Sequence, residues 1–140
     1  MSKSISNWIS YSDGYKYQLR EDYSIQTSIT GYSVDTEYVS LDVNGVLTLK
    51  HGYASDGPSG PTFDTRNSIR GGFVHDALYW LMRNSHISMK HKPYIDELFR
   101  KILVADGMWK VRAYIWYLGV HKKGIEHLYP SCERPILRAP

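Results

Sequence analysis

The spacing of apolar residues changes in the middle of the chain, at a Gly- and Pro-rich segment over residues 52–62. Before it, apolar and polar residues alternate, which is typical of strands with one buried face. After it, apolar residues recur at helical spacing. The segment holds three Gly and two Pro in eleven residues, which excludes a helix or a central strand there. We therefore expect an α+β fold in which a small N-terminal antiparallel sheet precedes three packed helices.

The alternating runs predict the strands of the sheet. Asn44-Gly45 lies between two of these runs, and Asn-Gly in that position is the strongest short signal for a β-hairpin. We therefore expect a small antiparallel meander. Its strands are expected over residues 15–19, 23–29, 38–43 and 46–49.

Capping signals mark the expected helices. Asp64 or Thr65 can cap the first helix, Lys92-Pro93 opens the second, and Gly124 closes the third. The helices are expected over residues 65 to about 83, 92 to 106, and 108 to about 123. A length of 140 residues with no internal repeat and no linker predicts one domain. It would comprise an N-terminal arm (about 1–14), a sheet with the Gly/Pro loop (15–64), three helices (65–124) and a tail (125–140).

Several classes of protein are excluded by composition. Cys132 is the single cysteine, which rules out an internal disulfide and a Cys-based zinc site. The first residues contain no apolar run suited to a signal peptide. The most apolar run, 73–82, is short and contains His75 and Asp76, so no transmembrane segment is expected. We expect the chain to fold in the cytosol.

Charge is unevenly distributed, although the net charge is only +3. Residues 1–64 hold four Lys or Arg against eight Asp or Glu, so the positive charge lies in the second half. A basic half can bind an anionic partner, but dispersed bases are also typical of a solvated helix face. No nucleic-acid-binding module is recognisable. The aromatic and basic residues of 109–116 have helical spacing, which favours a core position with Lys110 and Arg112 reaching solvent.

His75 and Asp76 lie in an otherwise apolar helix. The remaining residues of 73–82 are all apolar or aromatic and cover most of the helix circumference. A buried ionised Asp is costly unless it is paired, hydrogen-bonded or bound to a metal ion. The sequence therefore predicts partners for both side chains.

The second helix supplies one candidate partner. Asp96 lies at the border of its apolar stripe, whereas Glu97 points away. The short connection 84–92 predicts an antiparallel helix pair, so Asp96 can approach His75. A His held by a carboxylate is oriented and kept basic, as a general base acting on water must be.

The Gly/Pro loop supplies a second candidate. Asp56 and the backbone carbonyls of 57–60 offer oxygen ligands, which suit a hard cation such as calcium or magnesium more than zinc. With Asp76 they could hold a metal ion beside His75. The alternative is that His75 and Asp76 are satisfied core polar groups that tie the helix to the sheet, and that the loop is a plain turn.

A series of short motifs occurs in order between Tyr17 and Gly124. They are Tyr17-x-Leu19-x-x-Asp22, the loop 55–61, His75-Asp76-x-Leu78-Tyr79, Asp96-x-x-Phe99-x-x-x-Leu103, Gly107, and a closing helix through Tyr117, Val120 and Gly124. This ordered set resembles the phage and prophage family known as domain of unknown function 1353. The resemblance implies a phage origin and supplies no established reaction.

A more distant similarity concerns mechanism. His-Asp-x-x-Tyr on a helix, after a Gly-rich loop and before an Asp on an antiparallel helix, is similar to secreted phospholipases of the A-two class, and most of all to the disulfide-free version in parvovirus capsid proteins. The similarity implies that His75 activates water, that Asp96 orients His75, and that Tyr79 donates a hydrogen bond to Asp96. It also implies a calcium site. The ligands would be Asp76 and loop carbonyls near Gly57 and Gly60.

Other interpretations stay open. The ligand order of the His-Asp phosphohydrolases would here be His51, His75-Asp76, and Asp96 or Asp106. For the function, one hypothesis is a divalent-cation-dependent hydrolase of esters or amides encoded by a phage. The other is a non-catalytic virion or tail component, or a binder of a host factor, in which the same residues form a structural network. Both place the protein in the host cytoplasm or the assembled virion.

Overall fold

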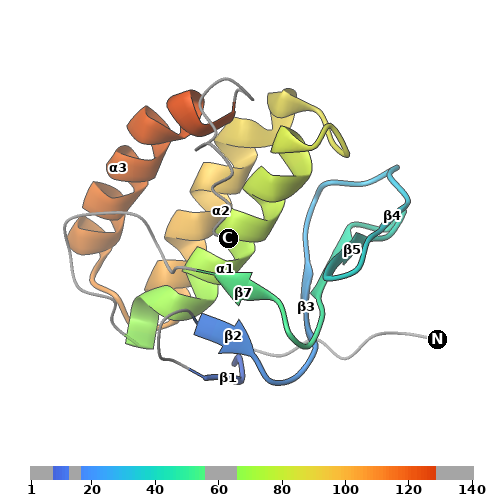
Figure 1. Cartoon of the computed structure of the whole chain (residues 1–140). Helices are drawn as coiled ribbons and strands as arrows, with labels where there is room; N and C mark the ends of the chain where they lie inside the picture. Colours follow the sequence, from blue (N-terminus) through green and yellow to red (C-terminus); the bar gives the residue numbers. More distant parts are fainter. Residues whose placement is uncertain (1–7, 13–16, 56–65, 129–140) are drawn as a thin grey trace, which may run out of the picture.

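The computed structural model describes residues 8–12, 17–55 and 66–128, and its elements form the expected α+β fold (Figure 1). Short strands occupy the N-terminal part, and three packed helices follow. The strands are β1 (Tyr11–Ser12), β2 (Tyr17–Leu19), β3 (Tyr23–Gln26), β4 (Val34–Asp35), β5 (Val39–Leu41), β6 (Val46–Leu49) and β7 (Ala54–Ser55). The helices are α1 (Arg66–Arg83), the 3-10 turn η1 (Met89–His91), α2 (Lys92–Ala105) and α3 (Lys110–Leu128).

The strands form two small antiparallel sheets, ordered β3-β6-β5-β4 and β1-β2-β7. The predicted hairpin at Asn44-Gly45 joins β5 to β6. Gly45 has a φ of +87°, and a Cβ atom there would lie 2.5 Å from the Thr27 carbonyl oxygen, so the turn requires glycine.

The expectation of one simple meander was wrong in two respects. β2 belongs to the second sheet, because the N–H of Leu19 donates to the carbonyl oxygen of Tyr53 and its carbonyl accepts from Gly52. β3 pairs with β6 rather than with its sequence neighbour. Alternation predicts which residues form strands, but it carries no information about which strands pair.

Two of the three helices have the expected extents, and the third is longer. α1 ends at Arg83, and α2 begins at Lys92 with Pro93 in its first turn. α3 continues through Gly124 to Leu128, so that glycine does not close it. A glycine inside a helix costs only about 1 kcal/mol relative to alanine, which the remaining turns can offset. None of the described helices is both long enough and apolar enough to span a membrane.

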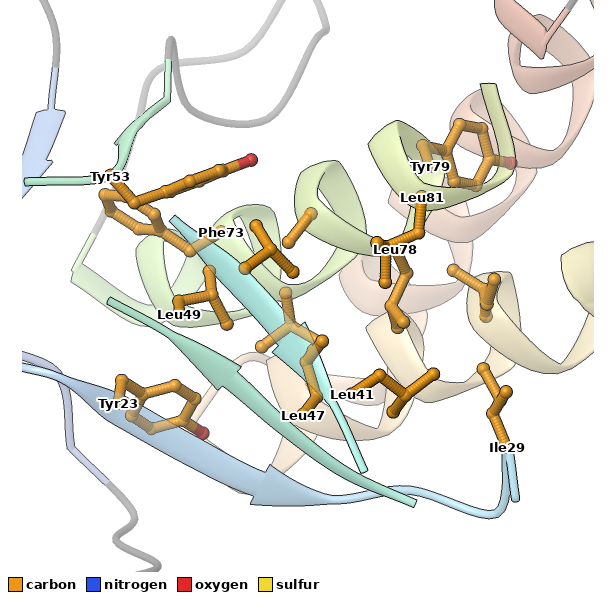
Figure 2. Packing of buried hydrophobic residues seen from close by; sticks show 14 of the residues in the cluster. Tyr23, Ile29, Leu41, Leu47, Leu49, Tyr53, Phe73, Leu78, Tyr79 and Leu81 are labelled. Atoms are coloured by element: carbon orange, nitrogen blue, oxygen red, sulfur yellow. The ribbon is translucent and has the colours of Figure 1, made fainter. Parts of the chain in front are cut away.

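The main core lies between α1 and the four-stranded sheet (Figure 2). Phe73 and Leu78 of α1 face Leu41, Leu47 and Leu49 of the strands, and all five are fully buried. α2 packs on another side of α1, and α3 packs on α2 (Figure 1). α1 therefore lies between the sheet and α2, and the buried polar side chains on it lie between these layers.

Gly71 allows α1 and α2 to pack closely. A Cβ atom at this position would lie 3.2 Å from both Phe99 Cδ1 and Leu103 Cδ2. The same two helices meet again at His75 and Asp96, one turn further along α1 and one turn back along α2. α1 and α2 are therefore antiparallel, and the close approach at Gly71 brings the polar residues of the two helices into contact.

Candidate functional site

The predicted pair of His75 and Asp96 is in contact. Nε2 of His75, on α1, lies 2.9 Å from Oδ1 of Asp96, on α2. Tyr79, one turn after His75, donates its hydroxyl hydrogen to the same oxygen over 2.6 Å. His75, Tyr79 and Asp96 form one cluster between the two helices. The helix pairing predicted the approach of Asp96 to His75, and the similarity to phospholipases implied the contact of Tyr79 with Asp96.

Asp96 is completely buried, and both of its oxygens are engaged. Besides His75 and Tyr79 on Oδ1, Nζ of Lys92 lies 2.7 Å and Nδ1 of His121 lies 3.0 Å from Oδ2. Burial alone would raise the pKa of Asp96, but the hydrogen bonds from His75, Lys92 and Tyr79 outweigh it and hold that pKa well below its usual range. Asp96 is therefore a buried carboxylate that keeps its charge.

The charge on Asp96 determines the tautomer of His75. An ionised carboxylate can only accept hydrogen bonds, so the His75 nitrogen facing it, Nε2, carries the hydrogen. In the neutral imidazole Nδ1 is then unprotonated, and no hydrogen bond joins Nδ1 to any residue that the structure describes. The His75 ring packs on the rings of Tyr79 and Phe99, with centroids 4.1 Å and 5.0 Å away. Its side chain keeps 13% of its surface exposed, which gives solvent access that Asp96 lacks.

Asp76 has a different partner and a different environment. Its Oδ2 accepts a hydrogen bond of 2.8 Å from the hydroxyl of Tyr53. Burial, and then the negative charge of Asp76, raise the pKa of that hydroxyl far above its usual range. Asp76 also lines a cleft of about 540 Å³, together with Tyr53, Tyr38 and Trp80. His75 and Asp76 are neighbours in the sequence but lie at different sites. His75 contacts Asp96 between α1 and α2, and Asp76 lines the cleft beside Tyr53.

The predicted calcium site is only partly within the described residues. Asp56, Gly57 and Gly60 lie outside them, so Asp76 is the one predicted ligand whose position is known. Within the described ranges, no group of three or more His, Cys, Asp or Glu side chains is arranged to hold a metal ion. The calcium site stays a prediction.

The ligand set of the phosphohydrolase alternative is not brought together. His51 is exposed, and its backbone N–H donates to Oδ1 of Asp22 over 2.7 Å. Asp106 is bound through both oxygens by Arg70. Neither residue has a hydrogen bond to His75 or Asp76 among the described side chains.

Two residues of the Asp96 cluster were not predicted. Lys92 precedes Asp96 by one helical turn, a spacing that favours an ion pair and could have revealed this contact. His121 comes from α3, and its carbonyl oxygen also accepts from Nζ of Lys92 over 3.0 Å. No local pattern connects His121 to Asp96, because their contact depends on how α3 packs on α2.

One buried side-chain polar atom lacks a hydrogen-bond partner in the part of the chain that the structure describes. Nε1 of Trp116 is buried without a hydrogen bond among the described residues. Trp116 packs on Phe99, with ring centroids 6.5 Å apart, in the second core between α2 and α3. The polar cluster at Asp96 is therefore bordered by an apolar wall.

Comparison of the chain with models of protein families, with curated proteins and with solved structures found no match. The resemblance to the phage family and the similarity to phospholipases therefore stay predictions from the sequence motifs.

Proposed function

We propose that this protein is a hydrolase of esters or amides, in which His75 is the general base and Asp96 holds its imidazole ring. The observation that carries the proposal is the hydrogen bond between Nε2 of His75 and the buried, charged carboxylate of Asp96. Because this bond assigns the hydrogen to Nε2, it leaves Nδ1 with a free lone pair. His75 is also the partly exposed member of the pair.

The proposed reaction needs one proton acceptor and one water molecule. Nδ1 of His75 removes a proton from water as the water oxygen attacks the substrate carbonyl carbon. When the tetrahedral intermediate collapses, the bond from carbon to the leaving oxygen or nitrogen breaks, and the proton on Nδ1 passes to the leaving group. The imidazolium formed in between is stabilised by the negative charge of Asp96, which does not itself become protonated.

The other residues of the cluster position this pair. Tyr79 and Lys92 donate to different oxygens of Asp96 and therefore fix the carboxylate in two directions. Asp76 would supply one carboxylate ligand for a divalent cation, which would stabilise the developing negative charge on the substrate oxygen when bound. A cleft lined by Asp76, Tyr53 and Trp80 lies next to this cluster, and His75 is not among the residues that line it.

A second function is favoured by a different observation. Asp96 is fully buried and contacts side chains from all three helices, as a purely structural tie would. On this alternative the protein is a non-catalytic component of a phage virion or tail, or a binder of a host protein. The two candidate functions differ in the role of His75, which is a general base in the first and only a structural partner of Asp96 in the second.

The test is hydrolysis of a series of p-nitrophenyl esters and p-nitroanilides, with millimolar calcium or with a chelator. We expect the wild type to hydrolyse at least one of these substrates above the buffer rate, and His75→Gln to lose about 100-fold or more of that activity. The matched control is His51→Gln, because His51 is exposed and, among the described residues, only its backbone N–H has a hydrogen bond, which it donates to Asp22. Circular dichroism and thermal unfolding establish that both variants fold.

Equal rates for the wild type and a folded His75→Gln variant would contradict the proposal. So would a wild type that hydrolyses none of these substrates faster than buffer does. Either result favours the structural alternative.

A further inference from the structure

Helix α3 presents apolar side chains on the side that faces solvent. Trp109, immediately before α3, is 85% exposed, Val111 is 74% exposed and Ile115 is 61% exposed. Tyr114 and Leu118 are also exposed. The sequence favoured a core position for residues 109–116, but in that stretch the structure buries only Ala113 and Trp116. We call Trp109, Val111, Tyr114, Ile115 and Leu118 the α3 face.

Three residues of the α3 face lie on one side of the helix. Val111, Ile115 and Leu118 follow one another at intervals of four and three residues, so they form one stripe along the helix. Ala113, Trp116 and Val120 lie on the opposite side and belong to the second core. The stripe is therefore the outermost line of a helix whose other side is already packed, and it is convex. A convex apolar surface suits a flat partner better than an inserted peptide.

The charged residues of 108–123, the segment that carries the α3 face, are all basic. Between Met108 and Lys123 the sequence contains Lys110, Arg112, Lys122 and Lys123 and no Asp or Glu. A second copy of the chain docked on this face would bring these bases against each other, which disfavours a symmetric dimer. An apolar stripe with an adjacent Trp and flanking Lys and Arg is the composition of a helix that lies in the interface of an anionic membrane.

We propose that the α3 face binds the surface of an anionic lipid bilayer. Val111, Ile115 and Leu118 enter the boundary between headgroups and acyl chains, Trp109 lies at the headgroup level, and Lys110 and Arg112 contact lipid phosphates. The helix lies on the membrane and does not span it. This inference is independent of the chemistry proposed for His75, because among the described residues no member of the α3 face has a hydrogen bond or ring contact with His75, Asp76 or Asp96.

The test is sedimentation with vesicles of phosphatidylcholine alone and of phosphatidylcholine mixed with phosphatidylglycerol. We expect the wild type to bind the mixed vesicles and to lose most of that binding in high salt. Ile115→Asp should weaken the binding about tenfold or more. The double variant K110Q/R112Q should weaken it by about fivefold for each base removed. Both variants change exposed side chains, so we expect them to fold.

The matched control is Val43→Asp. Val43 is 56% exposed and lies in the connection between β5 and β6, away from α3. Its variant should therefore bind the mixed vesicles as the wild type does. The proposal is overturned if the wild type does not bind mixed vesicles, or if Val43→Asp and Ile115→Asp bind equally well. It is also overturned if light scattering shows a dimer that Ile115→Asp dissociates while vesicle binding is unchanged, because the face would then be an interface between copies.

Discussion

Nε2 of His75 lies 2.9 Å from Oδ1 of Asp96, and the Asp96 side chain has no exposed surface. The pair therefore combines a carboxylate that water cannot reach with a histidine that it can. Because Lys92 compensates the charge of Asp96, the cluster can hold that charge inside the helix layer. The stability of the helix layer and the chemistry proposed for His75 would both depend on this arrangement, and experiments can separate the two.

Asp96→Asn should be strongly destabilising. The variant leaves the buried ammonium of Lys92 without its counter-charge, and we expect the free energy of unfolding to fall by about 3–5 kcal/mol. Urea denaturation measures this loss. Glu97→Gln is the matched control, because Glu97 is partly exposed and its variant should cost less than about 1 kcal/mol. Similar losses in the two variants would show that Asp96 does not hold the cluster.

Stability should also fall in acid because of Asp96. Its pKa is lowered on folding, since the hydrogen bonds from His75, Lys92 and Tyr79 outweigh the effect of burial. In the unfolded chain the same group takes up a proton near its ordinary pKa of about 3.9. The contribution is therefore fully present above that pH and is lost as pH falls toward the lower pKa of the folded state.

Urea denaturation at several pH values between about 5 and 3 tests this dependence. The wild type should lose more stability over that range than Asp96→Asn, which lacks the titrating group. Parallel pH profiles for the two proteins would contradict the low pKa assigned to Asp96.

Arg70 should couple strongly to Asp106. Its guanidinium donates from Nε and Nη2 to the two Asp106 oxygens over 2.9 Å and 2.7 Å, and from Nη1 to the hydroxyl of Tyr23 over 2.9 Å. The pair is nearly buried and joins the start of α1 to the end of α2 and to β3. A double-mutant cycle with Arg70→Met and Asp106→Asn should give an interaction free energy of about 1–3 kcal/mol.

The exposed pair of Lys50 and Asp35 provides the comparison. Asp35 is 81% exposed, so the corresponding cycle should give less than about 1 kcal/mol. An Arg70–Asp106 coupling as small as that of the exposed pair would mean that this bridge does not tie the helices to the sheet.

Trp116→Phe should cost little. The variant loses part of a buried ring but also removes Nε1, a donor without a partner among the described residues, and leaving such a donor unpaired costs about 1–3 kcal/mol. We expect thermal unfolding to give a stability within about 1 kcal/mol of the wild type. Phe99→Leu removes ring volume from the same core without that relief, so it should be the more destabilising change. The opposite order would indicate that Nε1 has a partner.

Local signals in the sequence predicted much of the fold and part of the site. The Asn44-Gly45 turn, Pro93 and the two spacings of apolar residues depend on neighbours along the chain, and the hairpin and the helices followed from them. The contact of His75 with Asp96 followed from the antiparallel pairing of two helices joined by a short connection. Strand pairing and the α3 face did not follow, because both depend on which surfaces other elements cover.

In the Asp96 cluster, too, some contacts were predictable from the sequence and others depend on tertiary packing. Tyr79 lies on the same helix as His75, and its contact with Asp96 agrees with the motif similarity. The contact of Lys92 with Asp96 could have been predicted from their spacing of four residues. The contact of His121 with Asp96 could not, because it depends on how α3 packs on α2. Periodicity placed Asp96 at the edge of its apolar stripe, but the depth of its burial depends on all three helices.

The most direct test of the account is nitrogen-15 NMR of the His75 ring in the neutral state, assigned by comparison with His75→Gln. We expect a protonated, pyrrole-type Nε2 that donates to Asp96 and an unprotonated, pyridine-type Nδ1 that can accept a proton from water. A protonated Nδ1 with an unprotonated Nε2 would contradict it, because His75 could then neither donate to Asp96 nor act as the proposed base.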